Sequence, residues 1–195
     1  IGIVMGLASI SELKLNTHSD QASDFRDMIV SYSEDPRVIL IKLADRLEVM
    51  RSIAMFPEDK RLKKSWESLN LYAQIAHKLG LYNIKSELED LCMKYRFPEE
   101  YEDIRRKIDA TKTEREEYIA RFIAPIREVL DRNKFQYEIS ARVKSIYSIW
   151  NKMRRKEIPF EEVYDLFAIR IVFKALPFPS EKTQCWQIYS CVTDI

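Results

Sequence analysis

"ISARVKSIYSIWNKMRRKEIPFEEVYDLFAIRIVF", residues 139–173, decides the fold because the hydrophobic period changes within it. A basic helix is predicted over 142–156, and a loop follows around Pro159. The segment 164–173, "YDLFAIRIVF", is dense in β-branched and aromatic residues, which predicts a central strand. A helix followed by such a strand indicates the opening of an α/β domain.

The predicted basic helix has two different sides. Lys144, Ser148 and Lys152 follow one another at i, i+4 and i+8, so on a helix they form one polar stripe. This side therefore offers hydroxyl and ammonium groups, while the other side packs. Most of that other side is formed by Val143, Ile146, Ile149, Trp150 and Met153.

The chain before this stretch is predicted to be helical almost throughout. The segment after Pro36, "RVILIKLADRLEVMRSIAMF", is apolar nearly all round, which is typical of a helix buried on several sides. The other predicted helices cover 24–33, 58–79 (ended by Gly80), 82–96 and a charged amphipathic segment from 98 to about 134, with a break near Thr111 and Thr113 and a kink at Pro125.

Two short segments complete the pattern. "FQYEIS", residues 135–140, alternates apolar and polar residues as a half-buried strand does. The last residues, from 181 onward, are predicted to be helical. The fold class is therefore mainly α, with a helical part to about residue 134 and then the beginning of an α/β domain.

Composition excludes several classes of function. Lys plus Arg number 32 against 31 Asp plus Glu, so a net charge of +1 gives no general attraction to nucleic acid or membrane. The three cysteines lack metal-ligand spacing and suit the reducing cytoplasm. The first residues do not read as a signal peptide. We interpret the chain as a piece of a longer protein, since it starts at Ile1 and stops within an amphipathic segment.

Two places could carry chemistry. Asp45 is a carboxylate within a mostly apolar helix, where burial without a partner is costly. It is either paired with a neighbour such as Lys42, Arg46 or Arg51, or a metal ligand. The chain has two histidines, His18 and His77, and His77 is expected to have a solvated or core role rather than to bind a metal.

The second place is the stretch quoted above. Arg142, Lys144 and Lys152 can surround a polyphosphate, and a guanidinium can also stack on a purine base. Asp165 could hold Mg²⁺ against the same phosphates. The plainer interpretation is a solvated basic face on which Asp165 pairs with Arg170 or Lys144. Nucleic-acid binding through "NKMRRK" is weaker, because the basic run is short.

Four motifs follow one another along the chain: "VILIKLADRLEVMRS", "AHKLGLYNIKSELEDLCMKY", "ARVKSIYSIWNKM" and "VYDLFAIRIVF". In order and spacing they resemble those of the RelA/SpoT family, bacterial enzymes that make and destroy (p)ppGpp. On this resemblance, residues 1–96 correspond to the C-terminal half of an HD-type hydrolase domain. Residues 97–134 correspond to a helical connector, and 135–195 to the start of a nucleotidyltransferase-like synthetase domain.

The resemblance implies a GTP pyrophosphokinase of the stringent response, which transfers pyrophosphate from ATP to the 3′-hydroxyl of GDP or GTP with Mg²⁺. It implies that Arg142 stacks on adenine and that Asp165 is a Mg²⁺ ligand. Lys144, Ser148 and Lys152 would contact the phosphates of ATP, with Arg170 nearby. The family usually has "RPK" where this chain has "RVK", a change expected to matter little. No catalytic residue is expected within the chain, since the family's catalytic glutamate should follow Ile195.

The hydrolase half departs further from the family. Only Asp45 matches the family's Mn²⁺ ligands, and it is interpreted as a relic of that site. The family's "ADRLHNMRT" reads "ADRLEVMRS" here, with Glu48 and Val49 replacing His and Asn. Valine cannot hydrogen-bond a nucleotide or a water, so the hydrolase is expected to have decayed and Mn²⁺ to matter only if it is active.

Two further interpretations stay open: a non-catalytic helical regulatory module, and a Mn²⁺-dependent (p)ppGpp 3′-pyrophosphohydrolase. The expected partners are ATP and GDP or GTP. A ribosome would be contacted only through C-terminal regions absent here, and no membrane or direct nucleic-acid partner is expected.

Overall fold

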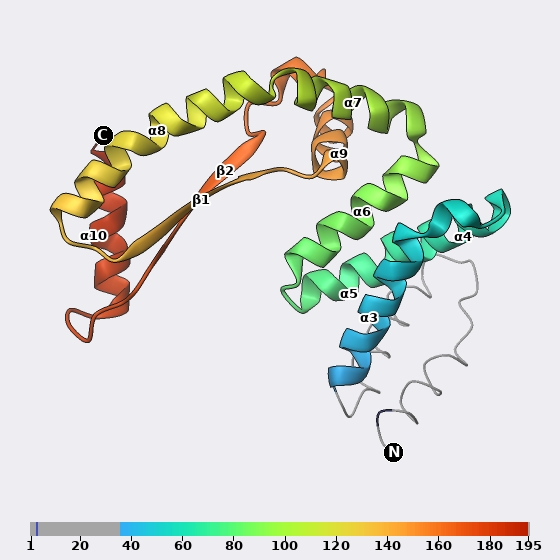
Figure 1. Cartoon of the computed structure of the whole chain (residues 1–195), viewed down its shortest axis with the longest axis horizontal. Coiled ribbons are helices and arrows are strands. Elements are labelled where there is room, and N and C mark those ends of the chain that lie inside the picture. Colours follow the sequence, from blue (N-terminus) through green and yellow to red (C-terminus); the bar gives the residue numbers. More distant parts are fainter. Residues whose placement is uncertain (1–2, 4–35, 195) are drawn as a thin grey trace.

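The structure, a computed structural model, describes residue 3 and residues 36–194. The described residues form an arch of helices, and a small two-stranded sheet runs beneath one limb of this arch (Figure 1). The predicted helix at 24–33 lies outside the described residues. Among the described helices, none has the length and apolarity to cross a lipid bilayer.

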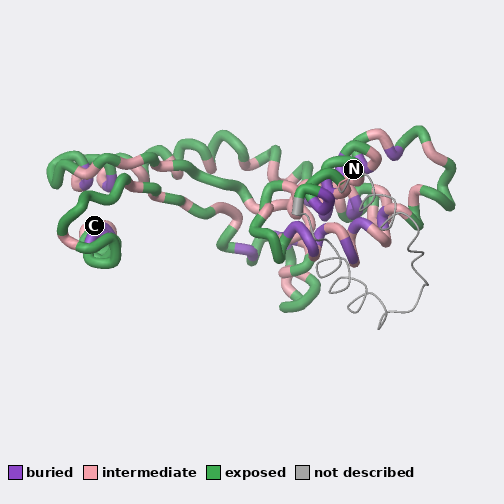
Figure 2. Tube along the Cα trace, turned by 90° about the horizontal axis from the view of Figure 1, so that it is seen from below, coloured by how far each residue is buried: buried purple, intermediate pink, exposed green. Residues whose placement is uncertain are grey.

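A helical body forms the first part of the described chain. Helix α3 (Pro36–Arg51) packs on α6 (Tyr82–Arg96). The chain between these two helices forms α4 (Glu58–Glu67), the π-helical turn η2 (Ser68–Tyr72) and α5 (Ala73–Lys78). A short 3-10 turn, η1 (Ile53–Met55), follows α3. Most buried residues lie in this body (Figure 2).

The predicted helix over 58–79 is confirmed as one helical path, but it contains a π turn that hydrophobic spacing did not predict. Gly80 ends it with a φ of 72°, a left-handed conformation in which a side chain would be strained. Helix α3 is less buried than predicted, since Leu40 and Ile41 remain 47% and 42% exposed. It packs through one face only, formed by Val38, Ile39, Leu43, Leu47 and Met50.

Two helices form the top of the arch. Helix α7 (Pro98–Ala110) and helix α8 (Lys112–Arg132) are separated at Thr111, which confirms the predicted break. Helix α8 runs through Pro125, the position of the predicted kink, without ending there. Ile126 and Leu130 of α8 are buried against the sheet and helix α10 (Glu181–Thr193).

The sheet consists of β1 (Tyr137–Val143) and β2 (Phe167–Phe173), which pair in antiparallel register. Its apolar face packs on α8 and α10. The prediction of a central strand was wrong for the described residues, because there β2 pairs with β1 alone and Val172 is 53% exposed. The mainly α fold class with an appended sheet is confirmed.

Helix α9 (Ile146–Lys156) and the 3-10 turn η3 (Phe160–Glu162) connect the two strands. Helix α9 packs beneath α7 (Figure 1). Of the residues predicted to pack, Ile146, Trp150 and Met153 are partly buried against one apolar cluster, whereas Val143 lies in β1 and is 38% exposed. Ile149 is fully buried in a cluster with Met93, Ile104, Phe160 and Val163. The core of the helical arch therefore also fixes the helix that carries the predicted polar stripe.

Candidate functional site

Two lysines meet at one aspartate. The Lys144 ammonium donates to one carboxylate oxygen of Asp165, and the Lys152 ammonium donates to the other. Lys144 precedes α9, Lys152 lies in its second turn, and Asp165 comes two residues before β2. The structure thus brings together three of the predicted site residues, and it also shows the plainer pairing of Asp165 with Lys144.

The predicted helix start at residue 142 was wrong. Arg142 and Val143 belong to β1, where they pair with Ala168 and Phe167, and α9 begins only at Ile146. The reason is Ser145, which accepts a hydrogen bond from the Ser148 amide at 3.3 Å and so caps the helix.

Lys144 reaches the site without being helical. Its backbone N–H donates to the Leu166 carbonyl at 2.8 Å, which holds the lysine beside Asp165 across the end of the sheet. Ser148 lies on α9 one turn before Lys152, and its hydroxyl pairs with that of Ser145 at 2.7 Å. The polar stripe is therefore made by a turn and a helix rather than by one helix.

The three charges shape the electrostatics of this site. Hydrogen bonds from Lys144 and then Lys152 lower the pKa of Asp165 to about 2, although burial acts in the opposite direction. The Asp165 side chain remains 47% exposed and that of Lys152 23%. The site is thus open to solvent, and its formal charge is +1 when Asp165 is ionised.

Arg142 and Arg170 lie on the open face of the sheet. Arg142 pairs with Ala168 and Ser140 pairs with Arg170, so the two arginines are diagonal neighbours on one face. The Arg142 guanidinium donates to the Ser86 hydroxyl at 2.8 Å. No ion pair or hydrogen bond of the Arg170 side chain occurs within the described residues, and it does not pair with Asp165.

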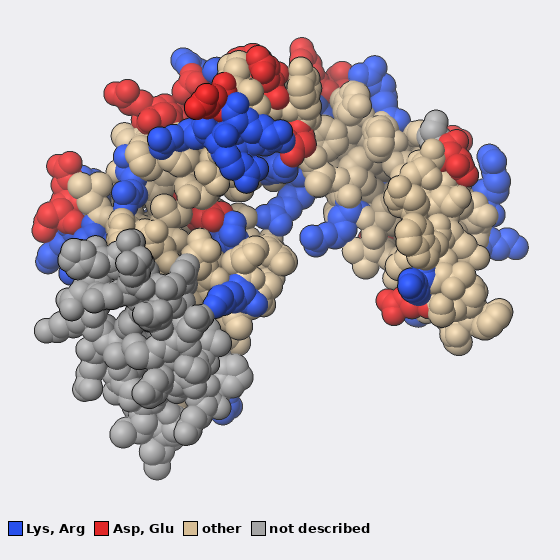
Figure 3. All heavy atoms as spheres, turned by 180° about the vertical axis from the view of Figure 1, so that it is seen from behind, with Lys and Arg blue, Asp and Glu red and all other residues tan. Residues whose placement is uncertain are grey.

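A cavity of about 440 Å³ opens beside these residues. Basic side chains also border the hollow that separates the helical body from the sheet (Figure 3). The cavity has the size of small-molecule sites in proteins. It lies between α6 and the turn before α9, lined by Asn83, Ser86, Glu87, Asp90, Leu91, Tyr101, Arg142, Val143, Lys144 and Ser145.

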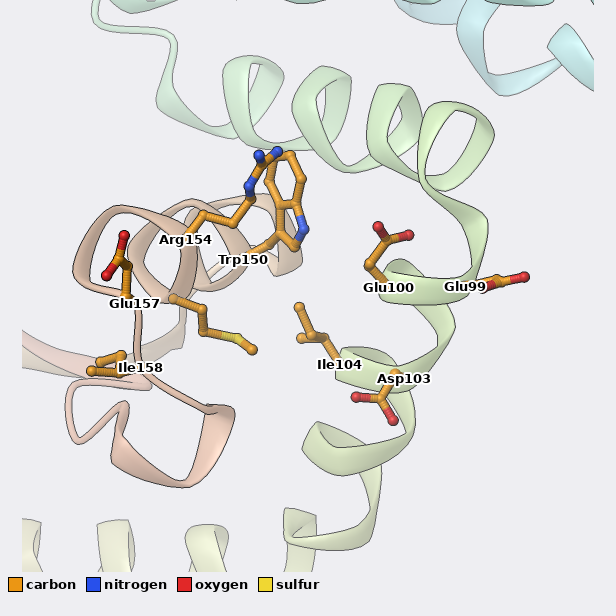
Figure 4. Close-up of a pocket in the computed structure, with 9 residues that line it drawn as sticks. Glu99, Glu100, Asp103, Ile104, Trp150, Arg154, Glu157 and Ile158 are labelled. Atoms are coloured by element: carbon orange, nitrogen blue, oxygen red, sulfur yellow. The ribbon is translucent and has the colours of Figure 1, made fainter.

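A larger cavity of about 580 Å³ lies between α7 and the end of α9. Figure 4 shows Glu100 and Trp150 on opposite walls, with the Arg154 guanidinium against the Trp150 ring at 4.9 Å from its centroid. Its charged lining consists of one arginine and four carboxylates, which would repel a polyphosphate. The smaller cavity has two cationic side chains, Arg142 and Lys144, against two carboxylates, so it suits an anionic ligand better.

The residues around Asp165 fit a Mg²⁺ ion only if a nucleotide supplies further ligands. No group of three or more potential metal-ligating side chains occurs among the described residues. One carboxylate is nevertheless a common protein share of a Mg²⁺ site in which phosphate oxygens and waters supply the other ligands. Asp165 fits that arrangement once its two lysines turn to the phosphates.

Asp45 differs from its predicted environment. It is exposed, and no ion pair of Asp45 occurs within the part of the chain that the structure describes. Arg46 instead pairs with Glu67 at 3.0 Å, and Arg51 pairs with Glu87 at 2.6 Å. The predicted salt bridge of Asp45 was therefore wrong for these residues, and its role as a metal ligand stays a prediction.

Sequence reasoning missed two residues of α6. Besides Ser86, the Asp90 carboxylate accepts from the backbone N–H groups of Ile146 and Tyr147, at 3.3 and 2.8 Å. No local pattern indicated these contacts, because more than fifty residues separate the partners. Ser86 and Asp90 are four residues apart, so both lie on one face of α6. This spacing is the feature of the sequence that could have indicated a shared role.

Two family models match parts of the chain. Residues 2–82 match the family described as HD domain, and residues 141–195 match the family described as a region found in RelA / SpoT proteins. The fold and these matches define a protein class in which an HD domain is followed by a RelA/SpoT region. The chain belongs to the RelA/SpoT family.

Relatives carry two kinds of name. A guanosine-3′,5′-bis(diphosphate) 3′-pyrophosphohydrolase of Aquifex aeolicus is 41% identical over 90% of this chain and 25% of its own length. A GTP pyrophosphokinase of Escherichia coli is 37% identical over 89% of this chain and 24% of its own length. A guanosine-3′,5′-bis(diphosphate) 3′-pyrophosphohydrolase of Haemophilus influenzae is 36% identical over 88% of this chain and 26% of its own length. The chain thus spans about a quarter of the length of these relatives.

Proposed function

We propose that this chain carries the ATP-binding half-site of a GTP pyrophosphokinase, an enzyme that transfers pyrophosphate from ATP to the 3′-hydroxyl of GDP or GTP. The observation that supports the proposal is the convergence of Lys144 and Lys152 on Asp165. Two ammonium groups and a carboxylate in contact form the charge arrangement that a Mg²⁺–polyphosphate requires.

In this proposal the lysines exchange partners when the nucleotide binds. Lys144 and Lys152 leave Asp165 for the phosphate oxygens, joined by the Ser148 hydroxyl. Asp165 is thereby freed to hold Mg²⁺, which when bound neutralises phosphate charge.

The base of ATP would lie beside Arg142. The guanidinium is planar and can stack on a purine while the Ser86 hydroxyl holds it from the edge. The cavity of about 440 Å³ next to Arg142 offers room for the base, and Arg170 extends the positive charge along the sheet. We assign no catalytic residue within the chain, so the proposal covers binding of the pyrophosphate donor.

The hydrolase half is proposed to be degenerate. Val49 is half-buried and its side chain offers no hydrogen bond, Glu48 is exposed, and Asp45 would be a relic of a Mn²⁺ site. A cytoplasmic location belongs to the proposal, as do GDP or GTP as acceptor and a ribosome contacted by other regions of a longer protein. Mn²⁺-dependent (p)ppGpp hydrolysis by such a protein would contradict the degenerate half.

The test is calorimetric titration of the chain with Mg·ATP, beside Arg142→Ala and the control Arg155→Ala. Arg155 is exposed and forms no ion pair among the described residues, so it matches the lost charge without touching the site. We expect binding that Arg142→Ala weakens and Arg155→Ala preserves. Absence of binding by the unaltered chain would overturn the proposal in favour of a non-catalytic helical module.

A further inference from the structure

The first turn of α9 has no free backbone donor. A helix normally leaves its first four N–H groups without partners inside the helix. Here the Ile149 amide makes the first bond of the helix itself, to the Ser145 carbonyl at 3.1 Å, and the Ser148 amide donates to the Ser145 hydroxyl at 3.3 Å. The amides of Ile146 and Tyr147 donate to Asp90 of α6. An anion from the helical body therefore occupies the position at which a helix could receive a phosphate.

Helix α6 contacts both ends of the same turn. Ser86 accepts from the Arg142 guanidinium at the end of β1, and Asp90, one helical turn later, accepts from the amides that open α9. Between these points Lys144 is held on its other side by Leu166 and Asp165. The turn is thus fixed from two directions, and its lysine reaches the site in one orientation.

The platform that carries these contacts is rigid. Leu88, Cys92 and Met93 of α6 are each no more than 1% exposed and belong to the core. Burial raises the pKa of Asp90, while the two amide hydrogen bonds lower it in opposition. The positive end of the α9 dipole also favours a carboxylate at this place. Core packing therefore fixes the helix that carries Asp90, and the first amides of α9 fix its carboxylate.

We propose that Asp90, assisted by Ser86, is a positioning residue of the ATP half-site: α6 fixes where α9 begins and so sets where Lys152 meets Lys144. This inference rests on the proposed function. It has two consequences. The half-site extends beyond the matched residues 141–195 into the helical body. The phosphates are bound by side chains, because the amides of α9 are already occupied.

The variants Asp90→Ala and Asp90→Asn test this inference, with Glu102→Gln as control because Glu102 is an exposed carboxylate on α7. Asp90→Ala removes both acceptors, and we expect Mg·ATP affinity to fall about fivefold. Asp90→Asn removes the same charge but keeps an oxygen acceptor for the amides, so it should bind more tightly than Asp90→Ala. Hydrogen exchange at the Ile146 and Tyr147 amides should accelerate in the alanine variant.

The outcomes separate the two proposals. If the unaltered chain binds no Mg·ATP, the proposed function itself fails. If it binds, and Asp90→Ala binds equally well although the amides exchange faster, Asp90 is only a helix cap and the inference is overturned. Should Asp90→Ala not fold, Ser86→Ala gives the answer, since it removes only the contact with Arg142. A lower affinity then supports the inference and an unchanged one overturns it.

Discussion

The Lys152 ammonium on α9 contacts the Asp165 carboxylate before β2, although thirteen residues and a turn separate them. Lys144 binds the other oxygen of the same carboxylate. Two cations are thereby held together by one anion on an exposed surface, where ion pairs contribute little to stability. An arrangement of this kind is easily explained by ligand binding, because the lysines can exchange Asp165 for phosphate.

Asp165→Asn should affect ATP binding in opposite directions with and without Mg²⁺. Removing the carboxylate takes away the proposed metal ligand, so affinity for Mg·ATP should fall. It also frees Lys144 and Lys152 from their ion pairs, so affinity for metal-free ATP should rise. Calorimetric titrations with Mg²⁺ and with a chelator measure both. A variant that binds both forms as the unaltered chain does would exclude Asp165 from the site.

The stability of the chain should depend on pH through Asp165. Its pKa is lowered to about 2 in the folded chain, against about 3.9 in an unfolded one. Because this pKa is lowered on folding, the ionised Asp165 carboxylate stabilises the folded chain fully above pH 4–5, about one unit above the unfolded pKa. This stabilisation is lost as the pH falls toward 2. Urea unfolding of the chain and of Asp165→Asn should therefore differ at pH 7, by roughly 1 kcal/mol or less, and converge near pH 2. A difference that does not change over this range would contradict the ion pairs.

The three cysteines should differ in reactivity. Cys92 is fully buried and its pKa is raised to about 12, first by burial, so it should stay protonated and protected. Cys185 is exposed. A thiol reagent at pH 8 should modify Cys185 rapidly and Cys92 only after unfolding. As a control, a chain with Cys185→Ser and Cys191→Ser should react only in denaturant, and fast reaction in native buffer would show that α6 is not packed as described.

Hydrophobic spacing predicted most of the helices but not where α9 begins. Lys144 fits the i, i+4 pattern with Ser148 and Lys152, so periodicity alone extended the helix back to residue 142. The start is set instead by the Ser145 cap, by the Asp90 carboxylate that accepts from the first two amides of α9, and by strand pairing of Arg142 and Val143. Pairing depends on a partner more than twenty residues away, which a local pattern does not contain.

The candidate site was predicted in its residue types and only partly in its contacts. Asp165 and Lys144 were expected to be neighbours, and they are. Asp45 was expected to need a partner because its helix is apolar, yet α3 leaves that side exposed. Ser86 and Asp90 were not expected at all, since their contacts depend on how α6 packs against α9. Tertiary packing, rather than propensity, decides each of these cases.

The most direct test of the ATP half-site is the affinity for Mg·ATP of Lys152→Ala beside Lys156→Ala. Both lysines lie on α9, but Lys156 is exposed and forms no ion pair within the described residues. Losing one charge-assisted contact should weaken binding by about 1.5–3 kcal/mol in Lys152→Ala, roughly ten- to hundredfold, and leave Lys156→Ala unchanged. Equal affinities of Lys152→Ala and the unaltered chain would contradict the account.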